Sequence, residues 1–332
     1  MANIDTKDLS FDEFDEVVNP RPEENDFDRI IESAISRRGF LGGVLAFGSF
    51  TALGTSLVPT GAKASDGRFA FTQIPTSTAD AVIVPEGYKS EVLVQWGDPL
   101  WSGVPEFDDA TRGTADSQAR AFGDNTDGMD VFSHDGKTLL VVNNEYTNRD
   151  IIALSAEDKR IMAEDDIAKG MMAHGISVVE IANDGGAWKI VKDSPYNRRI
   201  TPQSEMELTG PAAGHDLMKT EADPAGTKSL GTWNNCGNGV TPWGTYLTCE
   251  ENFNGYFSAP ENAEHEVSPE LARYGVSAKD WGYNWALIEE RYDVSKHPNE
   301  PNRAGYVVEI DPTDPTSTPK KRTALGRFKH EN

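Results

Sequence analysis

Hydrophobic positions beyond residue 65 recur mostly in short runs, which are bounded by glycine, proline, asparagine and aspartate. Such runs are typical of β-strands separated by tight turns. One segment differs, because the apolar positions of residues 150–175 recur at spacings of three and four, which predicts helix. The pattern therefore predicts an all-β protein with short helical insertions.

Three runs predict strands together with their turns. KTLLVVNNEY follows the turn at 134–137, and GISVVEIANDGGAWKIVKD reads as two strands around the turn at 183–186. Asp-Gly and Gly-Gly pairs are strong hairpin signals, because the favoured two-residue turns need positive φ. AGYVVEIDPTDPTSTPKKRTALGRF repeats this plan with a proline-rich turn.

The strands at 175–181 (GISVVEI) and 305–310 (GYVVEI) are near copies, about 130 residues apart. Recurrence of this kind favours a repeat architecture, and a β-propeller, six-bladed when complete, fits best. Two unrelated hairpins are the alternative, since VVEI is a common strand string. The chain stops at GRFKHEN directly after a strand, whereas a propeller must close its ring. We therefore interpret residues 65–332 as a partial propeller, truncated on its C-terminal side.

The chain is acidic, with 31 Lys and Arg against 54 Asp and Glu. Residues 1–35 hold 11 acids and three bases, and we expect this leader to be disordered. Residues 65–332 still carry 43 acids and 25 bases. Such a chain repels phosphate backbones, so we expect no nucleic-acid partner. An anionic substrate would need positive charge from elsewhere, and a bound metal ion is the obvious source. Acidity that merely keeps an exported protein soluble is the alternative.

Residues 36–64 have the three parts of an export peptide. Arg37 and Arg38 form a twin arginine, the apolar run 41–58 follows, and Ala62-Lys63-Ala64 supplies small residues for a signal peptidase. The run is short and glycine-rich for a membrane span, so we expect no stable anchor. The pattern resembles a twin-arginine signal, which predicts a periplasmic or extracellular protein that meets the twin-arginine machinery. That route takes folded cargo, frequently with its cofactor seated.

Cys236 and Cys249 are the only cysteines, and each stands among groups that bind cations. Cys236 lies between Asn234-Asn235 and Gly237-Asn238-Gly239, and Cys249 precedes Glu250-Glu251-Asn252. Thiolates beside carboxylates suit iron or zinc, and carboxylates with amide oxygens suit calcium. A Cys236–Cys249 disulfide is the alternative reading for an exported protein.

Two further strands end on similar polar groups. VVNNEYTN ends on Glu145, and RFKHEN ends on His330-Glu331-Asn332. Blades of a propeller deliver their strand ends to a central channel, so these acids are candidate ligands, although solvated strand ends are the simpler reading. FGDNTDGMD, residues 122–130, has the composition of a calcium loop without the EF-hand spacing.

NNCGNGVTPWGTYLTCEENFNGYF, VPEGYKSEVLVQWGDPL and ALGRFKHEN, behind a twin-arginine leader, resemble the PhoX family of bacterial alkaline phosphatases. The similarity runs from about Val84 to Asn332, and covers only the front part of a family member. The resemblance implies a propeller whose channel holds an iron and calcium cluster, Fe³⁺ and Ca²⁺, which hydrolyses phosphate monoesters. It also implies a set of metal ligands, namely Cys236, Glu250, Glu251, Glu331 and Glu145. Further site residues are expected beyond residue 332.

The favoured prediction is thus a secreted, metal-dependent alkaline phosphatase, acting as a monomer on phosphomonoester substrates. Two alternatives are another metallo-hydrolase on the same scaffold, such as a phosphodiesterase or lactonase, and a non-catalytic calcium-stabilised propeller that binds a partner.

Overall fold

The computed structural model describes residues 72–154, 161–260 and 266–331. The predicted leader, 1–35, and the predicted twin-arginine segment, 36–64, lie outside the described residues. Contacts divide the chain into two units, Met1–Ser90 and Glu91–Asn332. The described part of the first unit, 72–90, is extended chain with a turn in which the Tyr88 N–H donates to the Pro85 carbonyl (3.0 Å). Every helix and strand named below belongs to the second unit.

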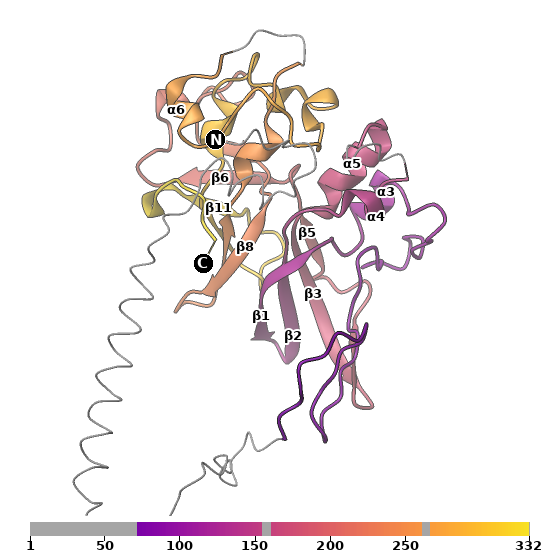
Figure 1. Ribbon diagram of the computed structural model, residues 1–332. Coiled ribbons are helices and arrows are strands. Elements are labelled where there is room, and N and C mark those ends of the chain that lie inside the picture. The colour runs from indigo at the N-terminus through magenta and orange to yellow at the C-terminus, as the bar shows by residue number, and fades with distance from the viewer. Residues whose placement is uncertain (1–71, 155–160, 261–265, 332) are drawn as a thin grey trace, which may run out of the picture. The chain divides into compact units, whose positions relative to one another are not determined.

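The first sheet of this unit has five strands (Figure 1): β1 (Thr126–His134), β2 (Lys137–Asn144), β3 (Gly175–Asp184), β4 (Ala187–Ile190) and β5 (Arg198–Ile200). β1 to β4 follow one another as antiparallel neighbours, and β5 pairs with the other end of β3. Both predicted turns are confirmed. Asp135 and Gly136 have φ of 48° and 75°, and Gly185 and Gly186 have φ of 65° and 99°.

The second sheet has six strands in the order β7-β6-β11-β10-β9-β8. Their bounds are β6 (Glu205–Thr209), β7 (Lys228–Leu230), β8 (Asn235–Val240), β9 (Tyr246–Glu250), β10 (Val307–Ile310) and β11 (Lys320–Arg322). The predicted hairpin with the proline-rich turn is confirmed as β10 and β11. β11 then pairs in parallel with β6, which is the one parallel contact between these strands.

The described helices are short, and most are single turns. The α-helices are α3 (Ala115–Gln118), α4 (Arg149–Ile152), α5 (Glu164–Ala173) and α6 (Pro269–Ala272). The 3₁₀ helices are η2 (Asp216–Met218), η3 (Phe253–Tyr256), η4 (Trp285–Leu287), η5 (Glu290–Tyr292), η6 (Glu300–Arg303) and η7 (Thr323–Leu325). α4 and α5 fall within or next to the segment predicted as helix, of which residues 155–160 are not described. The fold is therefore mainly β with few helices, as predicted, and its described strands form two open sheets.

The two sheets pack against each other through a shared core, because successive side chains of a strand point to opposite faces. On β2, Leu139 and Val141 face this shared core, and Leu140 and Val142 face a second cluster behind the first sheet. The shared core takes residues from both sheets, namely Phe132, Leu139, Val141, Ile176, Val178, Ile200, Met206, Tyr246, Val308 and Ile310. Burial on both faces explains why β2 reads as a continuous apolar run.

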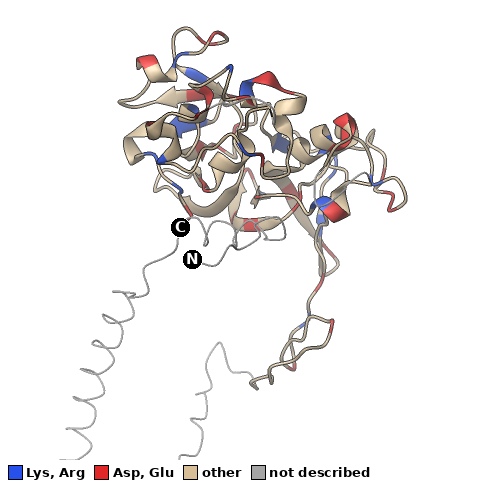
Figure 2. Cartoon of the chain, turned by 45° about the horizontal axis from the view of Figure 1, so that its top comes forward, with Lys and Arg blue, Asp and Glu red and all other residues tan. Residues whose placement is uncertain are grey.

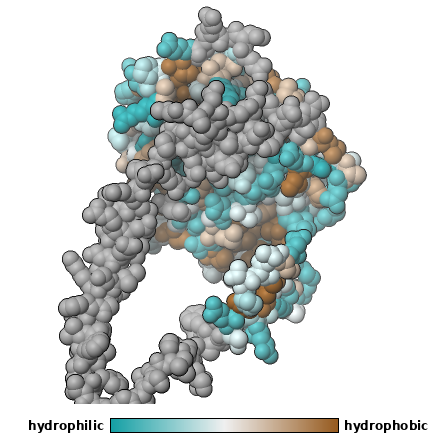
Figure 3. Space-filling view, in the orientation of Figure 1, coloured by the Kyte–Doolittle hydropathy of each residue, from teal (hydrophilic) through white to brown (hydrophobic). Residues whose placement is uncertain are grey.

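The surface of the described chain carries two features that bear on partners. Acidic and basic residues are interspersed over the elements in Figure 2. Hydrophobic side chains reach the surface in the part of Figure 3 that corresponds to the first sheet, and on β1 Met129 and Val131 are 50% and 55% exposed. In the part of the chain that the structure describes, no helix has the length and apolar character needed to cross a bilayer.

Candidate metal centre

Cys236 lies at the start of β8, where the ends of three strands meet. Its side chain is buried, and its Sγ lies 3.1 Å from Glu145 Oε1 and 3.3 Å from Glu251 Oε2. Glu145 directly follows β2, and Glu251 directly follows β9. The structure thus brings together three of the five residues that the sequence singled out, over separations of 91 and 15 residues.

Asp127 joins this group from β1. Ligand atoms of Asp127, Glu145 and Cys236 all lie within 4.8 Å of one another, a spacing at which they could hold a metal ion. Sequence analysis missed Asp127 as a site residue, although it lies in the run 122–130 whose composition resembles a calcium loop. The EF-hand test failed because that test looks for one continuous loop, whereas this group is assembled from separate strands.

Close approach of β1 and β8 makes the group possible. A Cβ on Gly128 would lie 2.5 Å from the Cys236 carbonyl oxygen and 2.8 Å from Asn238 Oδ1, so only glycine fits there. On the other side, Asn143 Nδ2 donates to the Cys236 carbonyl (2.6 Å), and Asn143 Oδ1 accepts from the Tyr246 hydroxyl (2.9 Å). These contacts fix the backbone of Cys236 between the two sheets.

The electrostatics of the group keep the thiol protonated without a cation. Burial raises the pKa of the Cys236 thiol well above its ordinary value, and the neighbouring carboxylates of Glu145 and Glu251 raise it further. A bound cation reverses this balance, because it favours the thiolate and lies between the carboxylates. Thiol and carboxylate donors together are a set that suits iron or zinc.

Glu250 points away from this group into the interior. It is fully buried, and Oε2 accepts the N–H groups of Gly305 (2.9 Å) and Tyr306 (3.0 Å). Oε1 lies 2.8 Å from the ammonium of Lys321, which is also fully buried. Burial lowers the pKa of Lys321, and the Glu250 carboxylate opposes that shift. Glu250 is thus held by a cation of the chain itself, and the structure does not bring it to Cys236.

Glu331 lies beside the same strand end. The His330 N–H donates to the Glu250 carbonyl (3.1 Å), which fastens the segment to the end of β9. The Glu331 side chain itself is exposed, and it is not a member of the group formed by Asp127, Glu145 and Cys236. Its role as a metal ligand stays a prediction.

A family model described as alkaline phosphatase PhoX matches residues 69–332. The chain belongs to the PhoX alkaline phosphatase family. A solved structure, Pseudomonas fluorescens PhoX in complex with vanadate, a transition state analogue, is 50% identical to the chain with a TM-score of 0.75. The match covers 79% of this chain and 45% of that chain, so this chain spans less than half the length of that relative. A search of curated proteins found no match. The resemblance drawn from the sequence is confirmed.

The residues of this PhoX chain fit a metal ion in two respects. The donor set around Cys236 combines a thiol with three carboxylates from Asp127, Glu145 and Glu251. In addition, Asn252, whose amide contacts Glu251, has a buried side-chain oxygen without a hydrogen-bond partner. A buried amide oxygen ordinarily has a partner, and such oxygens are ligands that calcium accepts.

Both cysteines of the PhoX chain are free thiols, Cys236 buried and Cys249 half-buried. The alternative disulfide between them is therefore not present in the structure. Because Cys249 lies on β9 opposite Val307, it is held in the sheet and leaves the Cys236 thiol to the carboxylates.

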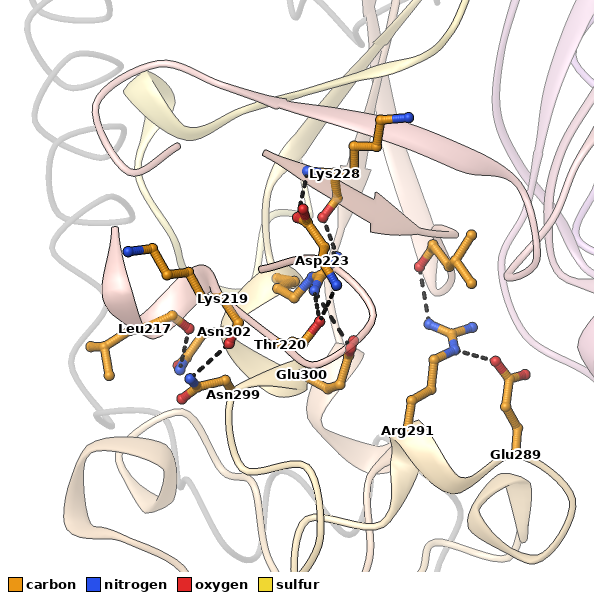
Figure 4. A network of polar contacts seen from close by, with 12 residues as sticks. Leu217, Lys219, Thr220, Asp223, Lys228, Glu289, Arg291, Asn299, Glu300 and Asn302 are labelled. Carbon is orange, nitrogen blue, oxygen red and sulfur yellow. Dashed lines mark hydrogen bonds and ion pairs between the residues drawn. The ribbon is translucent and has the colours of Figure 1, made fainter. Parts of the chain in front are cut away.

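A cavity of about 290 Å³ elsewhere in the unit contains none of these residues. Thr220, Asp223 and Glu300 converge on one place in Figure 4, and Arg303 contacts all three. Arg291, the second arginine of the cavity wall, donates to backbone oxygens and to a carboxylate. Both positive charges of this wall already have partners on the chain, so the cavity is not the better candidate for substrate phosphate.

Proposed function

We propose that this chain forms the metal-holding part of a secreted alkaline phosphatase that hydrolyses phosphate monoesters. The observation that carries the proposal is the convergence of Cys236 with Glu145, Glu251 and Asp127 in a PhoX chain. The relative's bound vanadate, a transition state analogue, supports phosphoryl chemistry for that protein, and we extend it to this one.

The residues of the group would hold iron through the Cys236 thiolate and calcium through the carboxylates. Bound ions supply the positive charge that phosphate ester hydrolysis needs, which the acidic chain does not supply in excess. The role of the chain's own residues is to position the atoms that would bind the metal ions. Cys236 is fixed by Asn143 from β2, Asp127 is brought in by the crossing at Gly128, and burial of the thiol excludes water from one side of the group.

We further infer that the two sheets are neighbouring propeller blades. β1-β2-β3-β4 and β8-β9-β10-β11 are both antiparallel meanders of four, and the two VVEI strings fall on the third strand of each. Val178 and Val308 occupy the shared core from these equivalent strands. The ion pairs of the two meanders differ, because Glu180 on β3 pairs with Lys137 on the preceding strand β2, whereas Glu309 on β10 pairs with Arg322 on the following strand β11. Repetition of the strand order and of the place of the VVEI string within it supports a repeat over two hairpins that are alike by chance.

The twin-arginine pattern at Arg37 and Arg38 supports export to the periplasm or beyond, with residues 65–332 as the phosphatase domain, which would act as a monomer. Replacing both arginines by lysine should leave the uncleaved protein in the cytoplasm. Export of this variant at the wild-type level would exclude the twin-arginine route.

The metal proposal is tested with the full chain, purified after iron and calcium loading and compared with Cys236→Ser and Cys249→Ser. Elemental analysis should find iron in the wild type and Cys249→Ser, but not in Cys236→Ser. Hydrolysis of an aryl phosphate monoester, an aryl diester and a lactone is measured on the same samples. Equal iron in all three proteins would refute the metal centre, and turnover of the diester or lactone alone would refute the monoesterase.

A further inference from the structure

Asn234 connects the segments that carry the candidate ligands through its backbone. Its φ of 51° lies in the left-handed region, which asparagine tolerates better than most residues. In this conformation its N–H donates to the Glu145 carbonyl (3.1 Å), and its carbonyl accepts from the Glu251 N–H (2.9 Å). One residue thus ties the end of β2 to the end of β9, two residues before Cys236.

The side chain of Asn234 is 4% exposed and makes two further contacts. Oδ1 accepts from the Asn252 N–H at 2.6 Å, and Nδ2 donates to the Tyr256 hydroxyl at 3.3 Å. Tyr256 is itself fixed, because its hydroxyl lies 3.0 Å from His174 Nε2 and 3.2 Å from the Tyr283 hydroxyl. His174 is also held from its other side, because its Nδ1 lies 2.7 Å from the Gly170 carbonyl, which can only accept. Asn234 is therefore anchored to a rigid aromatic wall.

Asn252 connects Asn234 to the Glu251 carboxylate. Asn252 is 4% exposed, and its Nδ2 donates to Glu251 Oε2 at 2.7 Å. The same carboxylate oxygen lies 3.3 Å from the Cys236 sulfur. The chain of contacts thus runs from Asn234 through Asn252 to the oxygen of Glu251 that faces the thiol.

We propose that Asn234 and Asn252 are positioning residues that hold the Glu251 carboxylate against Cys236 for metal binding. This inference rests on the proposed metal centre. The chemistry explains why amides are used here. An amide N–H orients a carboxylate by a hydrogen bond but carries no net charge, so the charge of the carboxylate stays available for a cation. A lysine in the same place would fix the carboxylate and neutralise it.

The test separates the side chain of Asn234 from its backbone. Asn234→Gly keeps a residue that accepts φ near 51° and removes only the side chain. Affinity of the metal-free full chain for Ca²⁺ is measured by titration calorimetry for the wild type, Asn234→Gly, Glu251→Gln and the double variant. Partners that orient a ligand typically contribute about 10- to 100-fold in metal affinity, so we expect a loss of that size for Asn234→Gly. In the Glu251→Gln background the same change should cost less than about threefold, because the group that it positions is gone.

Asn284→Gly is the matched control. Asn284 is also buried, with φ of 58°, but its side chain donates to the Ile161 carbonyl (2.7 Å). It should leave Ca²⁺ affinity unchanged. Additive losses for Asn234→Gly and Glu251→Gln, or a loss for Asn284→Gly as large as that for Asn234→Gly, would overturn the proposal.

A second readout does not need the metal. Alkylation of Cys236 by iodoacetamide is followed by mass spectrometry in the metal-free variants, with Cys249 as the internal reference. Asn234→Gly should speed alkylation of Cys236 several-fold relative to the wild type. In the Glu251→Gln background, adding Asn234→Gly should leave the alkylation rate unchanged. If the wild type binds no Ca²⁺, the proposed metal centre is refuted, and the alkylation rates of the four proteins then test the positioning of Glu251 by themselves. An effect of Asn234→Gly that disappears in the Glu251→Gln background supports the positioning role. Additive effects of the two substitutions refute it.

Discussion

Glu250 and Glu251 are neighbours at the end of β9, yet their side chains lie in opposite environments. Glu250 is fully buried and contacts the Lys321 ammonium and two backbone N–H groups. Glu251 is half-buried and contacts the Asn252 amide and the Cys236 thiol. Adjacent residues of an extended segment point to opposite faces, so the strand itself imposes this division.

The difference shows two ways of keeping a carboxylate inside a fold. On the Glu250 side the chain supplies the cation, and the pair joins β9 to β11. On the Glu251 side neutral groups hold the carboxylate close to other acids and a thiol. We therefore expect the first arrangement to matter for stability and the second for metal binding.

The largest effect should come from breaking the buried pair. Lys321→Met leaves Glu250 charged and buried without its cation, which typically costs about 3–5 kcal/mol. Urea unfolding at pH 7 measures this loss. The double variant Glu250→Gln/Lys321→Met should recover most of it, because neither charge remains, and it should keep the metal of the wild type. Metal loss in the double variant would show that Glu250 is a ligand after all and would break the comparison.

A smaller effect is expected where β1 crosses β8. Gly128→Ala places a methyl group 2.5 Å from the Cys236 carbonyl oxygen, and such overpacking costs about 1–3 kcal/mol. Because the strands must part, Asp127 should also leave the group and metal affinity should fall. Gly239→Ala on the same strand pair meets open space and serves as the control. Equal metal affinity for the two variants would show that the close approach is unimportant for the centre.

The pH dependence of stability tests the wall behind Asn234. Burial lowers the pKa of His174 to about 3, a backbone hydrogen bond to Gly170 opposes the shift, and Arg199 and Arg149 add to it. The unfolded chain, with an ordinary pKa near 6.5, then binds more protons than the folded chain between pH 6.5 and 3. Stability from His174 is therefore full above pH 6.5 and falls by about 1.4 kcal/mol for each pH unit below it.

His174→Gln should remove this slope, so the pH profiles of the two proteins should converge by about 1 kcal/mol between pH 6.5 and 5.5. The half-exposed His134→Gln is the control. Parallel profiles for the wild type and His174→Gln would contradict a neutral buried imidazole.

The smallest effect should follow from an exposed pair in the same sheet. Lys228 lies 3.0 Å from Glu205, and their side chains are 57% and 58% exposed. Lys228→Met should change the unfolding free energy by only about 0–1 kcal/mol. A loss as large as that of Lys321→Met would show that burial is not what distinguishes the two pairs.

Local signals predicted the strands and their turns well. Asp135-Gly136 and Gly185-Gly186 adopt the positive φ that their hairpins require, and no distant part of the chain was needed to foresee it. The predicted helix was less well defined, since α4 and α5 occupy only parts of the periodic segment. The family could also be predicted from the sequence, because long segments around Cys236 resemble those of PhoX phosphatases.

Pairings across the fold could not be read in the same way. Lys321 stands between Lys320 and Arg322, and the register of β11 with β10 decides which of the three faces Glu250. Asp127 is one of several acids in its run, and only the crossing at Gly128 selects it. Composition locates such groups, but the sheet decides which of them meet.

The position of β11 has a consequence for how the protein is made. Among the described strands, the hairpin of β6 and β7 joins the rest of its sheet through β11 alone, and a contact of β11 with β6 spans 112 residues of sequence. During synthesis the edges of β6 and β10 that face β11 therefore stay unpaired until residues 320–322 have left the ribosome. Exposed strand edges favour aggregation. Long-range parallel pairing is also slow, because the loop must close before any contact rewards it. We expect the pairing of β11 to set the time at which the edges of the second sheet are covered and no longer available for aggregation.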